Sequence, residues 1–387
     1  MISWVCVVAA ITFIAYVVIG YPLLLRAIAA RTVRPVVSGG EPVSVSVLIP
    51  VHNGALFIRE KLRSVLAQDY PRELMEIIVL SDGSTDETNE IVRESAPVGV
   101  RLIKTRHGGK PAALNLGISQ AKGEILVLTD VRQALDARCL RKLVARFADK
   151  NVGVVSGELV IRSGQTQAEV DIGCYWRFES WLRKQLARVD SMFGATGPIY
   201  AMRRSLAVTL PPDILLDDMY LPLHAFFKGY RLVVESEARV FDHPAKLGSE
   251  FRRKVRTLAG NYQILMYLPQ LLGPANRMWF HFVSYKLGRL LLPYALGGLA
   301  VSSLFLEGSF GHLVAWCQVA FYALAGLDIW VPRSPLKRIS SPVRTFVVMM
   351  IAAVCALMVF FVPAQSLWSQ STIKPVDASP LKEPVAS

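Results

Sequence analysis

Carboxylates at two places in the sequence could bind a metal ion or act in acid–base catalysis. Asp130 closes the apolar run "EILVLTD", and Asp217 and Asp218 stand side by side in "LLDDMYLPLHAFF". A single carboxylate in such a place can help to hold Mg²⁺ or Mn²⁺. Two adjacent carboxylates repel each other, which raises the pKa of one and suits it to act as a general base. The pair also suits the first turn of a helix, where acidic side chains are favourable, and the two roles are compatible.

A second group of polar residues could bind an anionic, hydroxyl-rich ligand. Lys110 follows two glycines in "HGGKPAALN", where the backbone can approach a ligand and the ammonium could neutralise a diphosphate. Asp82 in "SDGSTD" could accept hydrogen bonds from a base or from ribose hydroxyls. Each residue has a simpler interpretation, with Lys110 as a solvated lysine beside a helix start and Asp82 as a turn residue.

The elements that must position these residues alternate between strand and helix. Short apolar runs at 43–51, 77–80, 100–105 and 124–130 predict strands, and helical patterns or polar turns separate them. This alternation predicts an α/β domain with a mostly parallel sheet and helices on both faces. Ligands bind such sheets at the carboxyl ends of the strands. The polar residues that follow the predicted strands are His52, Asn53, Asp82, Lys110 and Asp130.

Four apolar segments predict membrane spans. Residues 2–25 carry no charge and exceed the roughly 20 apolar residues that cross a bilayer. We expect a retained anchor, because a cleaved signal peptide would begin with basic residues and have a shorter apolar run. Three further spans are expected at 290–306, 308–327 and 345–362. The predicted organisation is an anchor (1–31), a linker (32–42), the α/β domain (43–250), basic interfacial helices (251–280), about three spans (281–363) and a disordered tail (364–387).

The positions of Lys and Arg predict the orientation in the membrane. Arg26, Arg31 and Arg34 follow the first span, and four further basic residues lie at 333–344, whereas 307–312 has none. The positive-inside rule then places the α/β domain in the cytoplasm, and we expect a bacterial inner membrane. The net charge of +13 favours attraction to anionic membrane lipids rather than to nucleic acid, because the basic clusters flank apolar spans.

An ordered set of motifs resembles the family 2 glycosyltransferases of the GT-A fold. The motifs are "VSVLIPVHNG", "IIVLSDGSTDET", "HGGKPAALNLGI" and "ILVLTD", followed by "GATGPIYAMRR", "LLDDMYLPLHAFFKGYRLV" and "RRKVR". The resemblance covers roughly 43–260, and the apolar spans suit the integral-membrane branch that includes cellulose and hyaluronan synthases. It implies that Asp82 contacts uridine and that Asp218, beside Asp217, deprotonates the acceptor hydroxyl. It implies a nucleotide-sugar site formed by Pro50, His52, Asn53, Asp82, Lys110 and Asp130.

The resemblance also suggests where the acceptor binds. The segment "YWRFESWLRKQLARVDSMFGATGP" reads as an amphipathic helix followed by a turn of small residues. Such a helix can simply pack on the domain or lie at the membrane surface. The resemblance implies that it lines the acceptor site with the turn, through Trp181, Gly194, Ala195 and Thr196.

The first departure from the family pattern concerns the metal. The family usually shows Asp-x-Asp, but Arg132 replaces the second aspartate here. Asp130 could hold Mg²⁺ or Mn²⁺ with another residue such as His243, which could equally be an ordinary loop histidine. Alternatively, Arg132 could point away while diphosphate and water complete the metal shell, or could carry part of the charge and weaken the metal dependence. We favour the first two, because Mg²⁺ commonly needs only one or two protein carboxylates.

The second departure lies in the basic segment "SEFRRKVRTLAGNYQ". The membrane synthases show Gln-x-x-Arg-Trp there, whereas this chain has Arg253, Arg256 and Thr257. We expect Arg253 and Arg256 to lie near the diphosphate. The missing tryptophan removes a stacking surface that processive synthases use, which argues against polymerisation.

Together these features predict an inverting glycosyltransferase of the hexosyltransferase type at the cytoplasmic face of a membrane. The expected donor is a UDP-sugar, and the expected acceptor is a lipid or a lipid-linked glycan used in envelope polysaccharide or glycolipid synthesis. A processive polysaccharide synthase is one alternative. An inactive membrane protein that only binds sugar nucleotides is another.

Overall fold

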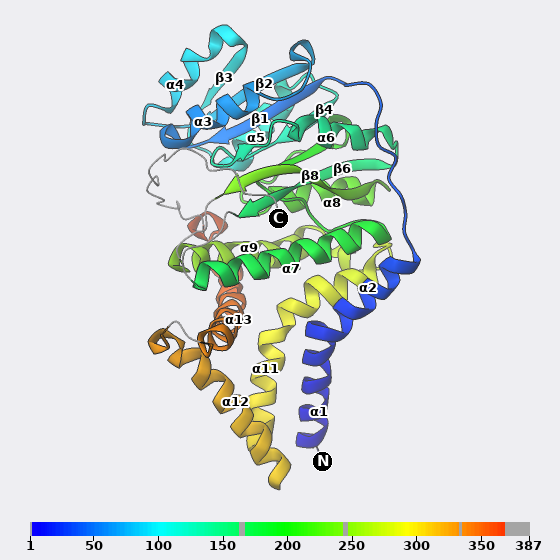
Figure 1. The fold of residues 1–387 in the computed structure, drawn as a ribbon, viewed down its shortest axis with the longest axis vertical. Coiled ribbons are helices and arrows are strands. Elements are labelled where there is room, and N and C mark those ends of the chain that lie inside the picture. Colours follow the sequence, from blue (N-terminus) through cyan, green and yellow to red (C-terminus); the bar gives the residue numbers. More distant parts are fainter. Residues whose placement is uncertain (1, 162–166, 243–246, 333–334, 368–387) are drawn as a thin grey trace.

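The computed structural model describes residues 2–161, 167–242, 247–332 and 335–367. An α/β domain, a layer of two long helices and a group of apolar helices follow one another along the longest axis (Figure 1). The two long helices are α7 (Gln167–Val189) and α9 (Leu247–Tyr267).

The α/β domain is built on one eight-stranded sheet in the order β3-β2-β1-β4-β7-β6-β8-β5. The strands from β3 to β4 are parallel, β7 runs antiparallel to β4 and β6, and β8 is parallel to β6. This confirms the predicted fold class. The strands are β1 (Val45–Val51), β2 (Met75–Asp82), β3 (Val100–Thr105), β4 (Ile125–Leu128), β5 (Ala134–Leu135), β6 (Val152–Ile161), β7 (Tyr200–Arg203) and β8 (Arg231–Asp242).

Strand β1 lies where the strand order reverses. Its Val45 pairs with Met75 of β2 on one side and with Ile125 of β4 on the other. The chain therefore moves outward from β1 through β2 to β3, then returns to β4 beside β1. A crevice for ligands forms at the carboxyl ends of two strands that diverge in this way.

Helices cover both faces of the sheet. Alternate residues of each strand point to opposite sides, so apolar side chains lie on both faces and pack against helices there. On one face, Leu48 and Leu126 pack with α5 and α8. On the other face, Val47 and Val127 pack with α3 and α6. These helices are α3 (Ala55–Leu66), α4 (Thr88–Glu94), α5 (Lys110–Gln120), α6 (Cys139–Ala145) and α8 (Asp217–Phe227).

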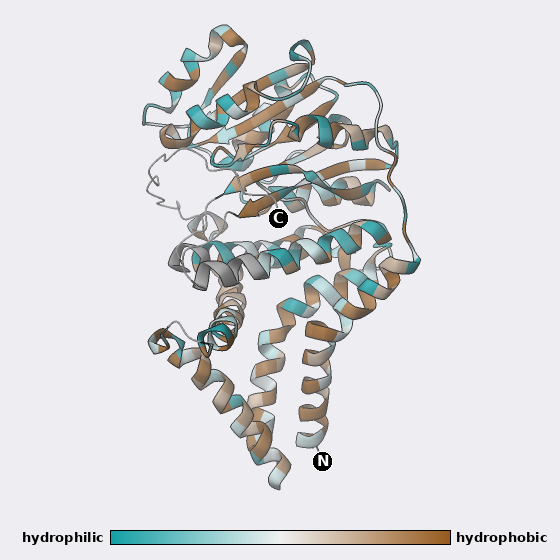
Figure 2. Ribbon diagram, in the orientation of Figure 1, coloured by the Kyte–Doolittle hydropathy of each residue, from teal (hydrophilic) through white to brown (hydrophobic). Residues whose placement is uncertain are grey.

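Four helical segments are long and apolar enough to cross a membrane, one near the N-terminus and three near the C-terminus, as predicted. They form the predominantly brown part of Figure 2 below the α/β domain. The segments are Ile2–Arg31, Trp279–Leu304, Ser309–Trp330 and Lys337–Phe360. They contain α1 (Ile2–Ala15), α2 (Tyr21–Arg31), α10 (Trp279–Phe282), α11 (Gly288–Leu304), α12 (Ser309–Leu327) and α13 (Lys337–Cys355).

The helices α7 and α9 connect the α/β domain to these spans. Helix α7 packs against α2, α13 and β8, and α9 packs against α13. The predicted interfacial layer therefore includes α7 in addition to the basic segment that begins in α9. The predicted tail starts with a short 3₁₀ turn, Ala364–Leu367, and its residues from 368 onward lie outside the described part.

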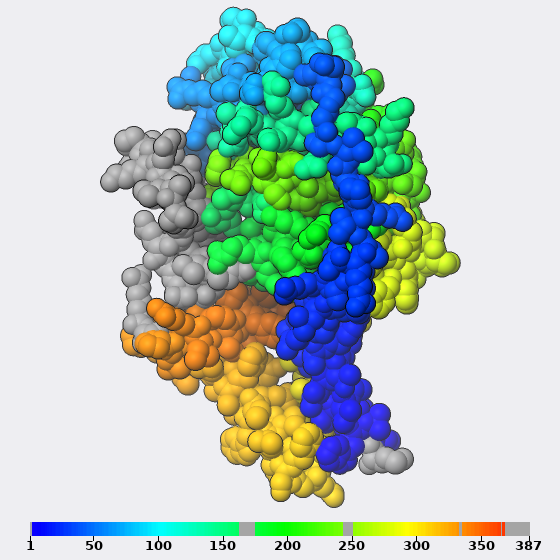
Figure 3. Space-filling model, turned by 45° about the vertical axis from the view of Figure 1, so that its right-hand side comes forward, coloured from blue at the N-terminus to red at the C-terminus, as the bar shows by residue number. Residues whose placement is uncertain are grey.

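The predicted linker, 32–42, has no helix or strand, yet it is docked on the α/β domain. Arg34 forms an ion pair with Asp190 at 2.7 Å. The guanidinium of Arg231 donates to the carbonyl oxygens of Arg34 and Pro35. Figure 3 shows this blue segment running along the outside of the α/β domain. These contacts hold the domain in a fixed orientation relative to the first span.

Candidate active site

The predicted carboxylates and the predicted lysine meet at the carboxyl edge of the sheet. Lys110, the first residue of α5, places its ammonium 3.0 Å from Asp130 and 3.0 Å from Asp217. Asp130 follows β4 by two residues, and Asp217 and Asp218 form the first turn of α8. One partly buried cation thus joins two segments that are 87 residues apart (217 − 130). Charge-assisted hydrogen bonds of this kind are among the strongest in proteins.

The environment of Asp218 suits a general base. Burial and the neighbouring charge of Asp217 together raise the pKa of Asp218 to about 6, while Lys110 acts in the opposite direction. A base works best when its pKa lies near the working pH. The location of Asp218 in the first turn of α8 opposes this rise, because a carboxylate is favourable at a helix N-terminus.

The same carboxylates act on Lys110 and Tyr200. Burial alone would lower the pKa of Lys110, but Asp130, Asp217 and Asp218 raise it above its ordinary value. The hydroxyl of Tyr200 is buried without a hydrogen-bond partner among the described residues. Burial and the same three carboxylates raise the pKa of Tyr200, so its hydroxyl stays protonated beside the cluster.

The small-residue turn predicted for the acceptor site lies directly against Asp218. The amide of Ala195 donates to the Asp218 carbonyl oxygen at 2.6 Å. A β-carbon at Gly197 would lie 2.9 Å from Asp218 Oδ2, so this glycine leaves room for the carboxylate. Arg183 fixes the turn by donating to Thr196 Oγ1 at 2.6 Å and to the Gly194 carbonyl oxygen at 3.0 Å.

Two features of this turn were missing from the sequence prediction, and one predicted residue lies elsewhere. Gly197 and Arg183 were not among the predicted site residues, although both stand in the quoted motifs. The predicted acceptor residue Trp181 packs against the core and stacks on Phe178, with ring centroids 6.0 Å apart.

A buried lysine fixes the loop that carries Asp130. The Lys61 ammonium donates to Thr129 Oγ1 and to the Gln133 carbonyl oxygen, both at 2.6 Å. Burial lowers the pKa of Lys61 to about 7, against the opposing effect of Asp130. The sequence carried a signal for this residue, because Lys61 falls between Ile58 and Leu62 on the buried face of α3.

Arg132, which stands where the family usually has an aspartate, is paired with Asp242 at the end of β8. Gln133 donates to the same carboxylate at 2.9 Å. The residue replacing a metal-facing carboxylate is therefore engaged with a carboxylate from another strand. His243, proposed as a metal ligand, lies outside the described residues.

Asp82, the last residue of β2, organises another part of the carboxyl edge of the sheet. Its carboxylate accepts the backbone amides of Gly108 and Gly109 at 2.7 and 2.9 Å. The ring nitrogen Nδ1 of His52 lies 2.6 Å from the Asp82 carbonyl oxygen, and Nδ1 of His107 lies 3.0 Å from its carboxylate. A ligand atom from each of His52, Asp82 and His107 lies within 4.8 Å of the others, so this group could hold a metal ion.

The remaining residues predicted for the donor site lie in β1, in the loop that follows it and on α9. Pro50 is buried inside β1, one residue before its end. Asn53 has a positive φ of 50°, and its side-chain oxygen accepts the Thr85 amide at 2.8 Å. Burial lowers the pKa of Arg256 on α9, while Asp130 and Asp218 act in the opposite direction, so this guanidinium lies in their field. Arg253 precedes it by three residues, which places both on one helix face.

Residues 46–209 match the family model described as "Glycosyl transferase family 2". The probable glycosyltransferase YdaM of Bacillus subtilis is 27% identical over 246 residues, covering 58% of this chain and 57% of that protein. Glycosyltransferase AglE of Haloferax volcanii is 28% identical over 233 residues, covering 57% of this chain and 74% of that protein. The match thus spans little more than half of YdaM. The mannosyltransferase PcManGT from Pyrobaculum calidifontis, solved with GDP-Man and Mn²⁺, has a TM-score of 0.71 and 25% identity, covering 91% of this chain and 98% of that one.

Proposed function

The chain carries a family 2 glycosyltransferase domain of the GT-A fold, and from this premise we propose a membrane-bound inverting transferase. Its donor is a nucleotide-sugar, with a UDP-sugar as the expected one, and its acceptor is a lipid or a lipid-linked glycan. The reaction takes place at the cytoplasmic face of the membrane, on the side indicated by the basic loops. The setting is envelope polysaccharide or glycolipid synthesis.

One observation carries this proposal. Asp218 lies at the start of α8, next to Asp217 and in a partly buried cluster with Lys110 and Asp130, and Gly197 leaves space at its carboxylate. A protein that only binds sugar nucleotides has no need of a carboxylate whose pKa is raised to about 6. The arrangement therefore supports catalysis over simple binding.

The reaction follows from these positions. Asp218 takes the proton of the acceptor hydroxyl while the hydroxyl oxygen attacks the anomeric carbon of the donor sugar. The bond from that carbon to the diphosphate oxygen breaks, and the nucleoside diphosphate leaves with the bonding electrons. A single displacement inverts the anomeric centre and needs no covalent enzyme intermediate. The cations Lys110 and Arg256 are suited to hold the diphosphate.

The carboxylates fit a divalent cation, and we propose Mg²⁺ or Mn²⁺ held through Asp130. The Asp130 side chain is 37% exposed, so its oxygens are accessible, and Asp217 has a buried oxygen without a partner among the described residues. Oxygen ligands of this kind suit both metals. When bound, the ion neutralises charge on the departing diphosphate. The group of His52, Asp82 and His107 fits less well, because Asp82 already accepts two backbone amides.

The experiment measures nucleotide release by the full chain in detergent with a lipid extract, across a panel of UDP-sugars and GDP-mannose. Each donor is tested with Mg²⁺, with Mn²⁺ and with EDTA. Release from one donor that is lost in EDTA would support the proposal and identify the sugar. Release that survives EDTA would show that arginine carries the charge assigned to the metal. Binding of donors without any release would favour the inactive binder.

A further inference from the structure

A cavity of about 440 Å³ lies where the interfacial helices α7 and α9 meet the membrane spans. Residues from three of the four spans line it, around Val17, Tyr285 and Phe346. The volume lies within the roughly 300–1,000 Å³ typical of ligand pockets. The sequence predicted that helix α7 lines the acceptor site but did not predict this cavity, and the turn at Gly194 is not part of its lining.

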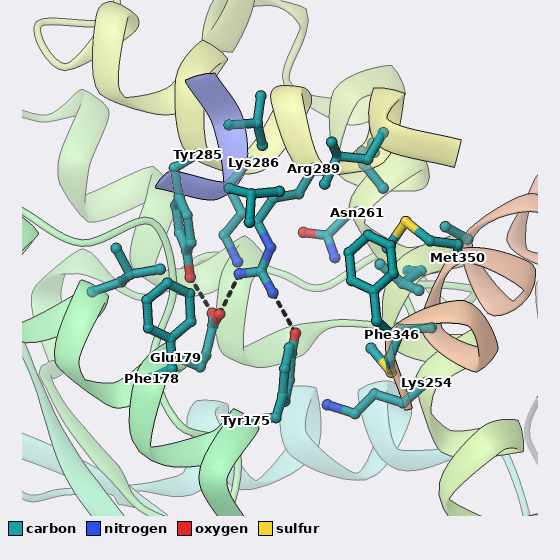
Figure 4. Close-up of a pocket in the computed structure, with 18 of the residues that line it drawn as sticks. Tyr175, Phe178, Glu179, Lys254, Asn261, Tyr285, Lys286, Arg289, Phe346 and Met350 are labelled. Carbon is teal, nitrogen blue, oxygen red and sulfur yellow. Dashed lines mark hydrogen bonds and ion pairs between the residues drawn. The ribbon is translucent and has the colours of Figure 1, made fainter. Parts of the chain in front are cut away.

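One end of the cavity is cationic. Lys254 of α9 and Lys286 and Arg289 from the second span line it together with one carboxylate, Glu179 of α7. The three cations outnumber the one carboxylate by two charges. Figure 4 shows the three cations approaching the region of Glu179 and Tyr175 from two sides. The Lys254 ammonium lies 4.4 Å from the centroid of the Tyr175 ring, and the Arg289 guanidinium lies 5.5 Å from it.

The single carboxylate is already occupied. Glu179 is hydrogen-bonded to both Tyr285 and Arg289. Burial alone would raise the pKa of Glu179, but the charges of Arg289 and Lys286 hold it below its ordinary value. The Lys286 ammonium has no hydrogen bond or ion pair with any described residue, and it lies 5.0 Å from the Tyr285 ring. A half-buried ammonium in this state is suited to pair with an anion from outside the chain.

The rest of the cavity wall is apolar and belongs to the membrane layer. Val17, Leu290, Phe346 and Met350 come from three different spans. An apolar chain can therefore lie in the cavity without leaving the depth of the bilayer. Thr257, which stands where processive synthases have a tryptophan, forms part of the wall, and its small side chain leaves the space open.

We propose that this cavity holds the lipid part of the acceptor, a lipid with a phosphate head and an aliphatic chain. The phosphate pairs with Lys254, Lys286 and Arg289, and the chain lies against the spans. This inference rests on the proposed transferase function and specifies its acceptor. Arg183 and Asp218 both lie close enough to Lys286 to interact with it electrostatically.

The first test measures binding of dodecyl monophosphate to the full chain by native mass spectrometry. Dodecanol, inorganic phosphate and phosphatidylglycerol are titrated in parallel. We expect dodecyl monophosphate to bind at least about ten-fold more tightly than either half alone. Equal binding of dodecanol would remove the role of the phosphate. If phosphatidylglycerol competed equally well, the cavity would be a structural site for bulk lipid. If inorganic phosphate bound more tightly, the aliphatic chain would play no part in binding. Each of these results would overturn the inference.

Charge variants assign the binding to this cavity. Lys286→Met removes an ammonium that has no hydrogen bond or ion pair among the described residues and should weaken dodecyl monophosphate binding at least about ten-fold, while Lys286→Arg should restore most of it. The matched control is Arg26→Met, which removes an exposed charge near the membrane outside the cavity. If Lys286→Met and Arg26→Met weakened the binding equally, the effect would come from general attraction of the phosphate to basic residues and not from this cavity.

A volume variant keeps the test independent of charge. Thr257→Trp should fill the cavity and weaken binding of dodecyl monophosphate, while donor binding, measured on the same sample, reports whether the α/β domain is intact. If the wild-type chain released nucleotide from a donor but did not bind dodecyl monophosphate, this inference alone would be refuted. A chain that binds the lipid through Lys286 but never turns over a donor would refute the transferase proposal instead.

Discussion

Gly197 lies against the carboxylate of Asp218, and a β-carbon at position 197 would lie 2.9 Å from Asp218 Oδ2. The turn that carries this glycine is fixed from the other side by Arg183. The space around the proposed base is therefore set by two residues that are neither acidic nor part of the nucleotide site.

Gly197→Ala tests this relationship. The added methyl should displace the Asp218 carboxylate and lower kcat about 10- to 100-fold, because a small misplacement of a catalytic group is costly. Donor affinity, measured separately, should change little. Gly298→Ala is the control, because a β-carbon there meets nothing within 4 Å. An unchanged kcat in Gly197→Ala would remove the glycine from the site.

The pH dependence of kcat/KM tests the role of Asp218. Its pKa is raised to about 6, and a base must be deprotonated to act, so activity should fall as the pH drops through about 6. Activity that stays constant down to about pH 4.5 would contradict the assignment.

Lys110→Met should move this acidic limb to higher pH. Lys110 lowers the pKa of Asp218, so its removal leaves the carboxylates repelling one another and easier to protonate. Donor binding should also weaken, since a cation beside the diphosphate is lost. Lys104→Met is the matched control, because Lys104 is exposed on β3. A limb that does not move, or moves to lower pH, would show that Lys110 does not act on the base.

Lys61→Met tests the buried lysine under the Asp130 loop. The pKa of Lys61 is about 7 in the folded chain and 10.5 as the ordinary value. Between these values the unfolded chain binds a proton that the folded chain lacks, so Lys61 makes stability rise with pH in this window. The melting temperature of the wild type, relative to that of Lys61→Met, should therefore rise between about pH 7 and pH 9.5. A constant difference between the two would mean that Lys61 is charged when folded.

Much of the fold could be predicted because its signals are local. The apolar runs predicted the first four strands to within a few residues, and long apolar segments with few charges predicted the four candidate spans. The meeting of Lys110 with Asp130 followed from the rule that strand ends share one edge of a parallel sheet. The contact of Lys110 with Asp217 went beyond that rule, because α8 reaches the edge only after β7 has reversed direction.

The missed features depend on contacts between distant segments. The partner of Arg132 is Asp242, 110 residues away, and no spacing rule pairs them. The cavity at Lys286 requires α7, α9 and three spans to be packed together before its charges converge. Gly197 stands in a quoted sequence motif, but its contact with Asp218 depends on where α8 begins.

The most direct test of the central claim compares nucleotide release by the wild type and by Asp218→Asn, using the donor found in the panel, with donor affinity measured on the same preparations. Asparagine keeps the shape of the side chain but cannot take a proton. We predict a rate lower by about 10²- to 10⁴-fold with donor affinity within about two-fold of the wild type. A variant that still turns over within about ten-fold of the wild-type rate would contradict the assignment of Asp218 as the base.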